Sequence, residues 1–569
     1  MLAKVRMLVP EAVSSKVLLA SAAVGLITGL LVSVFEYLTI EVVLHHVQKL
    51  PLAAQALAPV VGLVLAWLLL RTVGQGASNA TSEEYVTQFH SRRPTYKLQQ
   101  VPAKMLAGVA TIGSGGALGL EGPSIYMGSA IGHFVYEPLE RRLGRGAAQQ
   151  LLTAGAAAGV AAVFQTPATG VVFALESPYR DDVAHHALLP SLIAAAVSYL
   201  TFVAMPFTVT GTAVGYATDH QLGSGELVGA VVLGILAGFG GRTFAWFVRR
   251  AKDVSHDHNP LALAVVGGLT LSAVALIAQT LVDEPLTLGP GNAVIQWMIT
   301  TNTSTRILIA MFFLRAVATL TTVAAGGVGG LFIPLAVQGV LLGKIVGDGL
   351  DFVGLGGGRL EDPRLWPVLG LAAFLAAGYR TPIAAVMFVA ESSRGSAVVP
   401  ALIAAAFSQL VAGSSSVSVA QKEERLGGLE SRLALPLSAA LETDVMTVPP
   451  DASVNEFVWV HALGRRQAVV PVVDGNRYLG LCSVDSASDV DRERWDETPV
   501  TAIMDGSGPV ALPAWALRDA VAAMSRANTD VLPVTDGRGG FVGLVRESEI
   551  VKLNDILDET EASESTDPR

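Results

Sequence analysis

Long apolar runs separated by short polar segments dominate the chain up to about residue 413. Val17–Phe35 and Pro51–Leu70 contain no charged residue, and each is long enough to cross the ~30 Å hydrocarbon core of a bilayer. The pattern therefore predicts a series of helices that span or enter a membrane. Their approximate spans are 17–38, 52–72, 101–118, 148–164, 187–207, 225–248, 261–282, 305–325, 331–350, 366–378, 382–390 and 398–413.

Several of these segments are too short, or too interrupted by Gly and Pro, to cross a membrane as simple helices. Interrupted helices at membrane depth are tolerated only where they are buried in protein or line a wet cavity. The pattern therefore favours a transporter or a channel over a receptor bundle.

After residue 413 the apolar runs give way to polar and strand-like segments. Residues 413–436 are polar and have the composition of a helical linker that leaves the membrane. From about residue 444 two units repeat a Met-containing turn, a helix and two β-branched strands joined by Asp-Gly, which is a hairpin signal. The acidic end at 558–569 has the composition of a disordered tail.

The stretch Ala110–Gly128, ATIGSGGALGLEGPSIYMG, is rich in glycine and carries a single carboxylate, Glu121. A Gly-rich loop that runs into a Pro-containing helix start presents free N–H groups and the positive end of the helix dipole, and together these form an anion site. The residues alone leave a second interpretation open, in which the loop only packs helices and Glu121 is an ordinary acid at a helix start.

Two landmarks of this region recur later in the chain, in the same order and at nearly the same spacing. GLEGP at 119–123 corresponds to GLFIP at 330–334, and FQTPATGVVFALE at 164–176 corresponds to YRTPIAAVMFVAE at 379–391. We therefore expect two homologous membrane halves, with a binding site between them where interrupted helices meet.

The composition agrees with a membrane protein, and it argues against several classes of binding site. Charged residues make up 15% of the chain, against about 25% in a soluble domain. The basic clusters lie at span ends without interleaved aromatics, so we expect no nucleic-acid binding. Cys482 is the single cysteine, which excludes an intrachain disulfide. His256 and His258 lack further ligands nearby in the sequence, so we expect a solvated loop there and no metal site.

Together these motifs resemble the CLC family of chloride channels and proton-coupled chloride exchangers, over roughly residues 17–556. GLEGP is similar to the family's G-(K/R)-E-G-P motif, GLFIP to G-x-F-x-P, and the soluble repeat to the paired CBS module of many members. The resemblance implies an all-α membrane domain of two inverted halves with broken helices, followed by an α/β CBS pair. The implied segments are a cytoplasmic N-terminus (1–16), the membrane halves (17–208 and 225–413), a linker helix (414–443), CBS domains (444–500 and 501–556) and an acidic tail (557–569).

By this resemblance Glu121 is the gating glutamate. Its carboxylate would occupy an anion position when ionised and leave it when protonated or displaced. The backbone N–H groups implied as anion ligands belong to Leu120, Glu121, Gly122, Leu331, Phe332 and Ile333. Such groups bind a dehydrated halide without a full positive charge that would trap it.

Three positions depart from the family pattern. Gln75, followed by Gly76, stands where the family's first anion loop has serine, so the Gln75 amide would have to donate instead. Ser418 stands where the family has a tyrosine after the last membrane helix, which leaves the inner gate wider or lets another residue fill it. Ser177 replaces a second glutamate that serves the inner proton path in many exchangers. Because a serine cannot carry a proton reversibly near neutral pH, we favour a passive channel, with a proton-coupled exchanger as the alternative.

Other notable residues have simpler expected roles. Glu176 and Glu391 end the paired motifs, and we expect them to cap backbone groups at helix breaks. Tyr126 and Phe134 are expected to pack. In the CBS pair, Ser483, Ser486 and Glu549 belong to degraded nucleotide signatures. We therefore prefer a structural, dimer-stabilising role for the pair and keep adenine-nucleotide binding as the alternative.

The expected protein is a transport protein and not an enzyme. It needs no cofactor, and its partners are chloride or similar small anions, the lipid bilayer and a second copy of the chain. It should lie in a plasma or inner membrane with both termini in the cytoplasm. An intramembrane enzyme with Glu121 as general base is a distant alternative, because no nucleophile–base pair or metal-ligand set accompanies that residue in the sequence.

Overall fold

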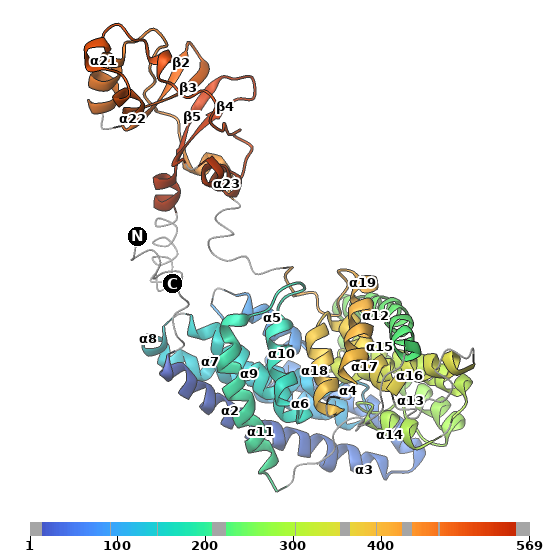
Figure 1. Cartoon of the computed structure of the whole chain (residues 1–569). Coiled ribbons are helices and arrows are strands. Elements are labelled where there is room, and N and C mark those ends of the chain that lie inside the picture. Colours follow the sequence, from blue (N-terminus) through green and yellow to red (C-terminus); the bar gives the residue numbers. More distant parts are fainter. Residues whose placement is uncertain are drawn as a thin grey trace. The chain divides into compact units, whose positions relative to one another are not determined.

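The structure is a computed structural model of the chain (Figure 1). It describes residues 14–553, except for 92, 145, 207–223, 302, 353–364, 394, 396, 424–434, 465–466 and 528. The chain divides into two compact units, Met1–Arg425 and Leu426–Arg569. The first unit is built from helices, and the second combines short strands with short helices.

Eight helices in the described part of the chain are long and apolar enough to cross a membrane. They are α2 (Ser15–Glu36), α4 (Leu52–Thr72), α9 (Ala147–Phe164), α11 (Leu188–Val203), α12 (Ser224–Asp257), α13 (Pro260–Val282), α15 (Thr305–Ala324) and α16 (Phe332–Phe352). A π-helical turn, η1 (Tyr37–Leu44), and α3 (His45–Gln48) continue α2 without a break.

Shorter helices fill the interior between these spans. They are α5 (Ser82–Phe89), α6 (Gln100–Gly113), α7 (Glu121–Tyr136), α10 (Pro167–Glu176), α14 (Asn292–Thr300), α17 (Leu365–Tyr379), α18 (Pro382–Ser392) and α19 (Val398–Ala412), with the single turns η2 (Glu137–Leu139), α8 (Glu140–Leu143) and η3 (His185–Ala187). The predicted spans missed α5, α7, α10 and α14. The first, third and last are short, and α7 is rich in Gly, Ser and Tyr, so none forms a long apolar run.

Reciprocal hydrogen bonds join the two halves of the membrane unit. The N–H of Gly119 donates to the carbonyl of Gly330 at 2.9 Å, and the N–H of Gly330 donates back to Gly119 at 2.7 Å. In the same way, the Ala117 amide donates to the Thr322 hydroxyl and the Val328 amide to the Thr111 hydroxyl, both at 3.1 Å. Such exchanged pairs are what a twofold relation between the halves produces.

The same relation appears in helix packing. A Cβ at Gly128 of α7 would lie 2.0 Å from the carbonyl oxygen of Gly155 on α9. A Cβ at Gly339 of α16 would lie 2.3 Å from that of Gly370 on α17. Small residues let membrane helices approach this closely, and here they pack the two Gly-rich motifs against the helices behind them.

The second unit contains two antiparallel sheets. One has β2 (Val469–Asp474) beside β3 (Arg477–Ser483), and the other has the order β1 (Leu441–Glu442), β5 (Phe541–Arg546), β4 (Val531–Thr535). The helical turns are η4 (Leu437–Ala440), α21 (Val454–Glu456), η5 (Phe457–Leu463), α22 (Val484–Ser488), η6 (Arg492–Arg494), η7 (Val500–Ala502) and α23 (Leu517–Ala527). Each sheet has its own buried cluster, as the two predicted repeats require.

One detail of the second unit differs from the predicted domain boundaries. Residues 437–442, predicted to be linker, pack into the second repeat, because β1 pairs with β5. Cys482 lies in the core of the first repeat, where burial raises the pKa of its thiol to about 12. The cysteine is therefore a core residue, in keeping with the strong tendency of free cysteine to be buried.

Residues 414–423, predicted to begin a linker helix, are not helical. Residues 416–422, which we call the strap, lie against the membrane unit. The Val417 amide donates to the carbonyl of Gly378 at 2.8 Å, and the Lys422 carbonyl accepts from the Arg180 amide at 2.8 Å. The Glu83 carboxylate accepts from the Val419 amide at 2.6 Å and also pairs with Lys252. These partners, all distant in sequence, replace the local hydrogen bonds of a helix.

The strap predicts which truncations the membrane unit tolerates. A chain ending at Ala434 keeps the strap and is expected to run as one folded species on size exclusion in mild detergent. A chain ending at Ala412 leaves several backbone groups and the Glu83 carboxylate without these partners, so its melting temperature should fall by several degrees. Equal melting temperatures for the two truncated chains, or aggregation of the longer one, would contradict this prediction.

Candidate anion site

Glu121 is the first residue of α7 and is fully buried between the two halves. Its Oε1 accepts a hydrogen bond of 2.6 Å from the amide of Phe332, the first residue of α16. The amides of Ile333 and of Glu121 itself also lie against the carboxylate. Glu121 thus lies across the N-termini of two helices, one from each half, where unpaired N–H groups and helix dipoles favour negative charge.

Glycine makes this approach of carboxylate to backbone sterically permitted. A Cβ at Gly119 would lie 1.9 Å from Oε2 of Glu121, and a Cβ at Gly330 would lie 2.1 Å from Oε1. No side chain fits at either distance, which explains why both motifs carry glycine at this point. Glu121 Oε2 has no hydrogen-bond partner among the described residues, so half of the carboxylate is free to bind a proton or to yield its place.

A third helix, α5, begins beside the same point. Thr81, its N-cap residue, donates from its hydroxyl to the carbonyl of Gly329 at 3.2 Å. A Cβ at Gly122 would lie 2.5 Å from the Thr81 hydroxyl oxygen. Three helix N-termini, those of α5, α7 and α16, therefore meet at one buried place, and the contacts described for Glu121 include no lysine or arginine side chain. Such a site attracts an anion through partial charges and does not hold it as a full cation would.

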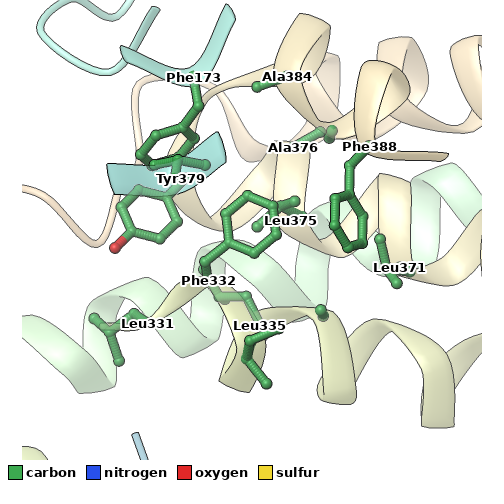
Figure 2. Packing of buried hydrophobic residues seen from close by; sticks show 14 of the residues in the cluster. Phe173, Leu331, Phe332, Leu335, Leu371, Leu375, Ala376, Tyr379, Ala384 and Phe388 are labelled. Carbon is green, nitrogen blue, oxygen red and sulfur yellow. The ribbon is translucent and has the colours of Figure 1, made fainter. Parts of the chain in front are cut away.

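An aromatic cluster holds the α16 end of the site. The centroid of the Phe332 ring lies 4.5 Å from that of Phe164 and 5.3 Å from that of Phe388. Phe173 lies 5.5 Å from Phe332 and 5.3 Å from Tyr379. Figure 2 shows Phe332 among the rings of Phe173, Tyr379 and Phe388, with the Tyr379 hydroxyl directed out of the cluster on the side of Leu331. The rings fix the Phe332 backbone, and so the amide that contacts Glu121.

Glu176 and Glu391 cap helices of the opposite half. The Glu391 carboxylate accepts from the amides of Ala168 at 3.0 Å and Thr169 at 2.7 Å, at the start of α10. The Glu176 carboxylate accepts from the amides of Ile383 at 3.1 Å and Ala384 at 2.9 Å, at the start of α18. These crossed caps confirm the predicted capping role, and they show that each carboxylate caps the other half of the repeat.

The predicted anion ligands Gln75 and Gly76 are not among the described contacts of Glu121, although Gly76 lines the cavity that leads to the site. Both residues are exposed in the turn after α4, with left-handed φ angles of 52° and 81°. The glycine pattern identified a turn, whereas the helix start that faces Glu121 comes a few residues later, at Thr81 and Ser82. Ser82 is the residue whose hydroxyl reaches the site, 3.5 Å from the hydroxyl of Tyr379.

Ser418 and Ser177 are buried, but neither is seen to contact Glu121. The Ser418 hydroxyl has no partner within the described part of the chain, and its amide donates to the Ser416 hydroxyl at 3.2 Å. The Ser177 hydroxyl is also unpartnered there, and its carbonyl accepts from the Gln421 side chain at 3.0 Å. Of the implied N–H ligands, those of Glu121, Phe332 and Ile333 lie at the carboxylate, and that of Leu331 lies at the Tyr379 hydroxyl. Within the described residues, the amides of Leu120 and Gly122 are not among the hydrogen-bond donors to the Glu121 carboxylate.

A buried ion pair supports the start of α5, and the sequence analysis did not predict it. Lys104 of α6 is fully buried, pairs with Glu84, and donates to the carbonyl of Ala80 at 2.6 Å. Its ammonium group also lies 4.3 Å from the centre of the Tyr126 ring. A buried pair of this kind is costly to break, so it fixes residues 80–84. The only signal in the sequence was a lone lysine in an otherwise uncharged helix. Tyr126 and Phe134 pack, as predicted.

A cavity of about 1120 Å³ leads to the same place. Thr81, Ser82 and Leu331 line it together with charged residues of both signs. The basic residues Arg71, Arg250 and Lys252 are matched by the acids Glu83, Asp253 and Asp257, and Lys252 pairs with Glu83. In the second unit, Ser483 accepts from the Ser486 amide at 3.0 Å and caps α22, while Glu549 pairs with Lys552. These contacts give the three residues local structural roles.

Comparison with solved structures gives the same fold. A slow cyanobacterial Cl⁻/H⁺ antiporter matches with a TM-score of 0.63 and 22% identity over 70% of this chain and 95% of that one. A CLC-type fluoride/proton antiporter matches with a TM-score of 0.61 and 22% identity over 72% and 98%. A eukaryotic CLC transporter covers 94% of this chain, with a TM-score of 0.57 and 20% identity over 97% of its own length.

Sequence relatives agree with the fold. The H(+)/Cl(−) exchange transporter ClcA of Klebsiella pneumoniae (strain 342) is 27% identical over 66% of this chain and 80% of its own. That of Cronobacter sakazakii (strain ATCC BAA-894) is 28% identical over 66% and 81%. A CBS-domain family model matches residues 500–555, and the family model described as voltage gated chloride channel matches residues 61–413. Because the latter match covers more than half of the chain, the protein belongs to the voltage-gated chloride channel (CLC) family and carries a C-terminal CBS region.

Proposed function

We propose that this membrane transporter exchanges chloride for protons and that Glu121 is the group through which the two are coupled. The observation that carries the proposal is the position of the Glu121 carboxylate on the amides of α7 and α16. The relatives named H(+)/Cl(−) exchange transporter and the antiporters among the solved structures support it.

The passive channel favoured in the sequence analysis is wrong, because these relatives are named exchangers. That expectation rested on one position, Ser177, where many exchangers of the family have a glutamate. One side chain on the inner proton path does not decide coupling, since a proton can reach Glu121 through another acid or through ordered water. The described structure places Glu84, which the sequence analysis did not consider, in the first turn of α5 beside this region.

Coupling follows from competition for the same donors. When ionised, the Glu121 carboxylate accepts from the Phe332 amide and excludes an anion from that position. When protonated, the carboxyl group no longer competes as an anion, and chloride can take the donors. A site that binds either the ionised side chain or chloride links the binding of a proton to the binding of an anion, and the linkage is reciprocal.

We propose the remaining arrangement from the charge pattern and the family. The chain lies in a plasma or inner membrane with both termini in the cytoplasm, since basic pairs occur near helix ends, at Arg141–Arg142 in α8 and at Arg249–Arg250 in the last turns of α12. The transporter is a homodimer with one pathway in each subunit. The CBS region has a structural role and requires no nucleotide, because Ser483 and Ser486 bond each other.

The test is proton movement in proteoliposomes that contain purified protein, a chloride gradient and a clamped membrane potential. An imposed chloride gradient is expected to drive protons against their own gradient at a fixed stoichiometry. Chloride flux without proton movement would refute exchange, and absence of chloride flux with movement of another halide would refute chloride as the substrate. Empty vesicles treated identically are the control.

A further inference from the structure

A stripe of polar side chains runs along one face of α7, and the chloride site does not use it. Tyr126, Ser129 and His133 are spaced by three and four residues, which places them on the same face of the helix. Tyr126 and Ser129 are fully buried, whereas His133, in the last turn, is partly exposed. Polar groups at membrane depth are costly and usually functional, so the stripe calls for a role of its own.

Neighbouring segments supply further polar groups that face the stripe. The Tyr96 hydroxyl lies 2.9 Å from the Ser129 hydroxyl. The centroid of the Tyr96 ring lies 5.6 Å from the centroids of both Tyr126 and His133. On the other side of Tyr126, the Lys104 ammonium lies 4.3 Å from the centre of the ring. The polar groups therefore form a continuous line from the end of α7 to Lys104.

The inner end of this line is the ion pair of Lys104 with Glu84, beside the start of α5. Residues 81–84 have the Thr-x-x-Glu sequence of a capping box, yet Thr81 makes no side-chain cap to α5. Its hydroxyl donates to a carbonyl of the second half instead, and the Glu84 carboxylate pairs with Lys104. A Cβ at Gly122 would lie 2.5 Å from the Thr81 hydroxyl oxygen, so this end of the line touches the first turn of α7.

Two polar atoms of the stripe have no hydrogen-bond partner among the described residues, the Tyr126 hydroxyl and Nδ1 of His133. Buried polar groups with a purely structural role are normally satisfied. The nearby phenol of Tyr85 shows the difference, because its hydroxyl donates to the carbonyl of Ala174 at 2.8 Å. The atoms of the stripe are thus available to exchange protons with each other and with bridging water.

We propose that this stripe carries the proton between the cytoplasm and Glu121, on a path separate from the anion cavity. The inference rests on the proposed exchange of chloride for protons. His133 lies at the end of α7 that leads to α8, which the proposed function places in the cytoplasm. Tyr96, Tyr126 and His133 are not among the residues that line the 1120 Å³ cavity. Proton and anion would therefore approach Glu121 along different walls of the protein.

The relay conserves one proton at each step. The neutral His133 imidazole takes a proton from cytoplasmic water and passes it to the hydroxyls, each of which gives up its own proton as it accepts one. The Glu84 carboxylate, ionised beside Lys104, accepts that proton. The resulting carboxylic acid delivers it to ionised Glu121 and returns to the ion pair. Glu84 would thus supply the inner carboxyl group that the serine at position 177 does not.

The test measures the ratio of protons to chloride moved by the purified full-length protein in proteoliposomes under a chloride gradient. Tyr96→Phe removes the hydroxyl bonded to Ser129 in the middle of the stripe, and His133→Gln removes the titratable group at its end. Each is expected to lower the ratio at least about fivefold while chloride flux persists. His133→Glu restores a side chain that can take up a proton, and it should recover about half of the wild-type ratio or more.

A matched control separates proton transfer from stability. Tyr85→Phe removes another buried phenol, whose hydroxyl bonds to Thr153 and Ala174 and not to the stripe. It should lower the melting temperature, because a buried acceptor loses its donor, and leave the ratio unchanged. Glu84→Gln combined with Lys104→Met replaces the ion pair by an uncharged pair, which avoids a lone buried charge. This double variant should lower the ratio as Tyr96→Phe does.

The outcomes distinguish this proposal from the proposed function. Wild-type ratios in both Tyr96→Phe and His133→Gln, an equal fall in Tyr85→Phe, or no recovery in His133→Glu would overturn the relay and leave the exchange intact. A wild-type protein that moves chloride without protons would refute the exchange, and the relay with it. If Tyr96→Phe does not fold, the two variants of the partly exposed His133 decide the matter.

Discussion

Glu121→Gln is expected to abolish chloride-driven proton movement while leaving chloride transport in place. Glutamine has nearly the same shape and can still accept from the Phe332 amide through its side-chain oxygen, but it cannot take up a proton or compete as an anion. Proton movement should fall by about an order of magnitude or more. The increase in wild-type anion flux that we expect at low external pH should disappear, because the variant is always neutral.

The measurement is paired chloride and proton flux in proteoliposomes across a range of pH. Glu140→Gln is the matched control, since it makes the same chemical change at an exposed position. Glu121→Ala should resemble Glu121→Gln and leave room for one more anion. A folded Glu121→Gln protein with the wild-type pH profile and intact proton movement would remove Glu121 from the coupling step and support the packing interpretation.

Glu391→Ala is expected to cause the largest loss of stability among the substitutions considered. The variant leaves the amides of Ala168 and Thr169 and the hydroxyl of Thr169 without an acceptor at the start of α10. Each buried donor left unsatisfied costs about 1–3 kcal/mol, so we expect a loss of about 3 kcal/mol and a clear fall in melting temperature. Glu176→Ala removes the corresponding cap of α18, with two amides affected.

Thermal unfolding in detergent, followed by a fluorescence or circular dichroism signal, measures the effect. Glu140→Ala serves as the comparison, because that carboxylate is exposed and its loss should leave the melting temperature nearly unchanged. Glu391→Gln should lie between wild type and Glu391→Ala, since it keeps one acceptor oxygen. Melting temperatures for Glu391→Ala and Glu176→Ala equal to that of Glu140→Ala would contradict the role of these carboxylates as caps.

The sequence was sufficient for those parts of the structure that local patterns encode. Apolar runs placed the long helices, and GLEGP with its counterpart GLFIP placed Glu121 opposite Phe332. Burial of a carboxylate at membrane depth needs donors, and a Gly-rich loop before a helix supplies them. The capping role of Glu176 and Glu391 followed from their place at the ends of repeated motifs.

The remaining parts depend on irregular segments, which carry no periodic signal. The Gly-x-Gly pattern around Gln75 marks a left-handed turn, whereas the helix start at Ser82 has no glycine and gives no signal in the sequence. Tyr379 was missed because an aromatic residue at the end of an apolar helix has the sequence signature of a packing residue. The preference for a channel failed because absence of an acid at one position, Ser177, does not report what the tertiary structure provides elsewhere.

The crossed caps have a consequence for biosynthesis. The start of α10 cannot be completed until Glu391 has been synthesised, more than 200 residues after α10 itself. Until the second half has been synthesised, the amides of Ala168 and Thr169 in the translocon or the bilayer have no acceptor from that half. The start of α10 can therefore reach its final hydrogen bonding only after the second half has been inserted. A chain whose synthesis stops between the two halves should be recognised by quality-control proteases as incompletely folded.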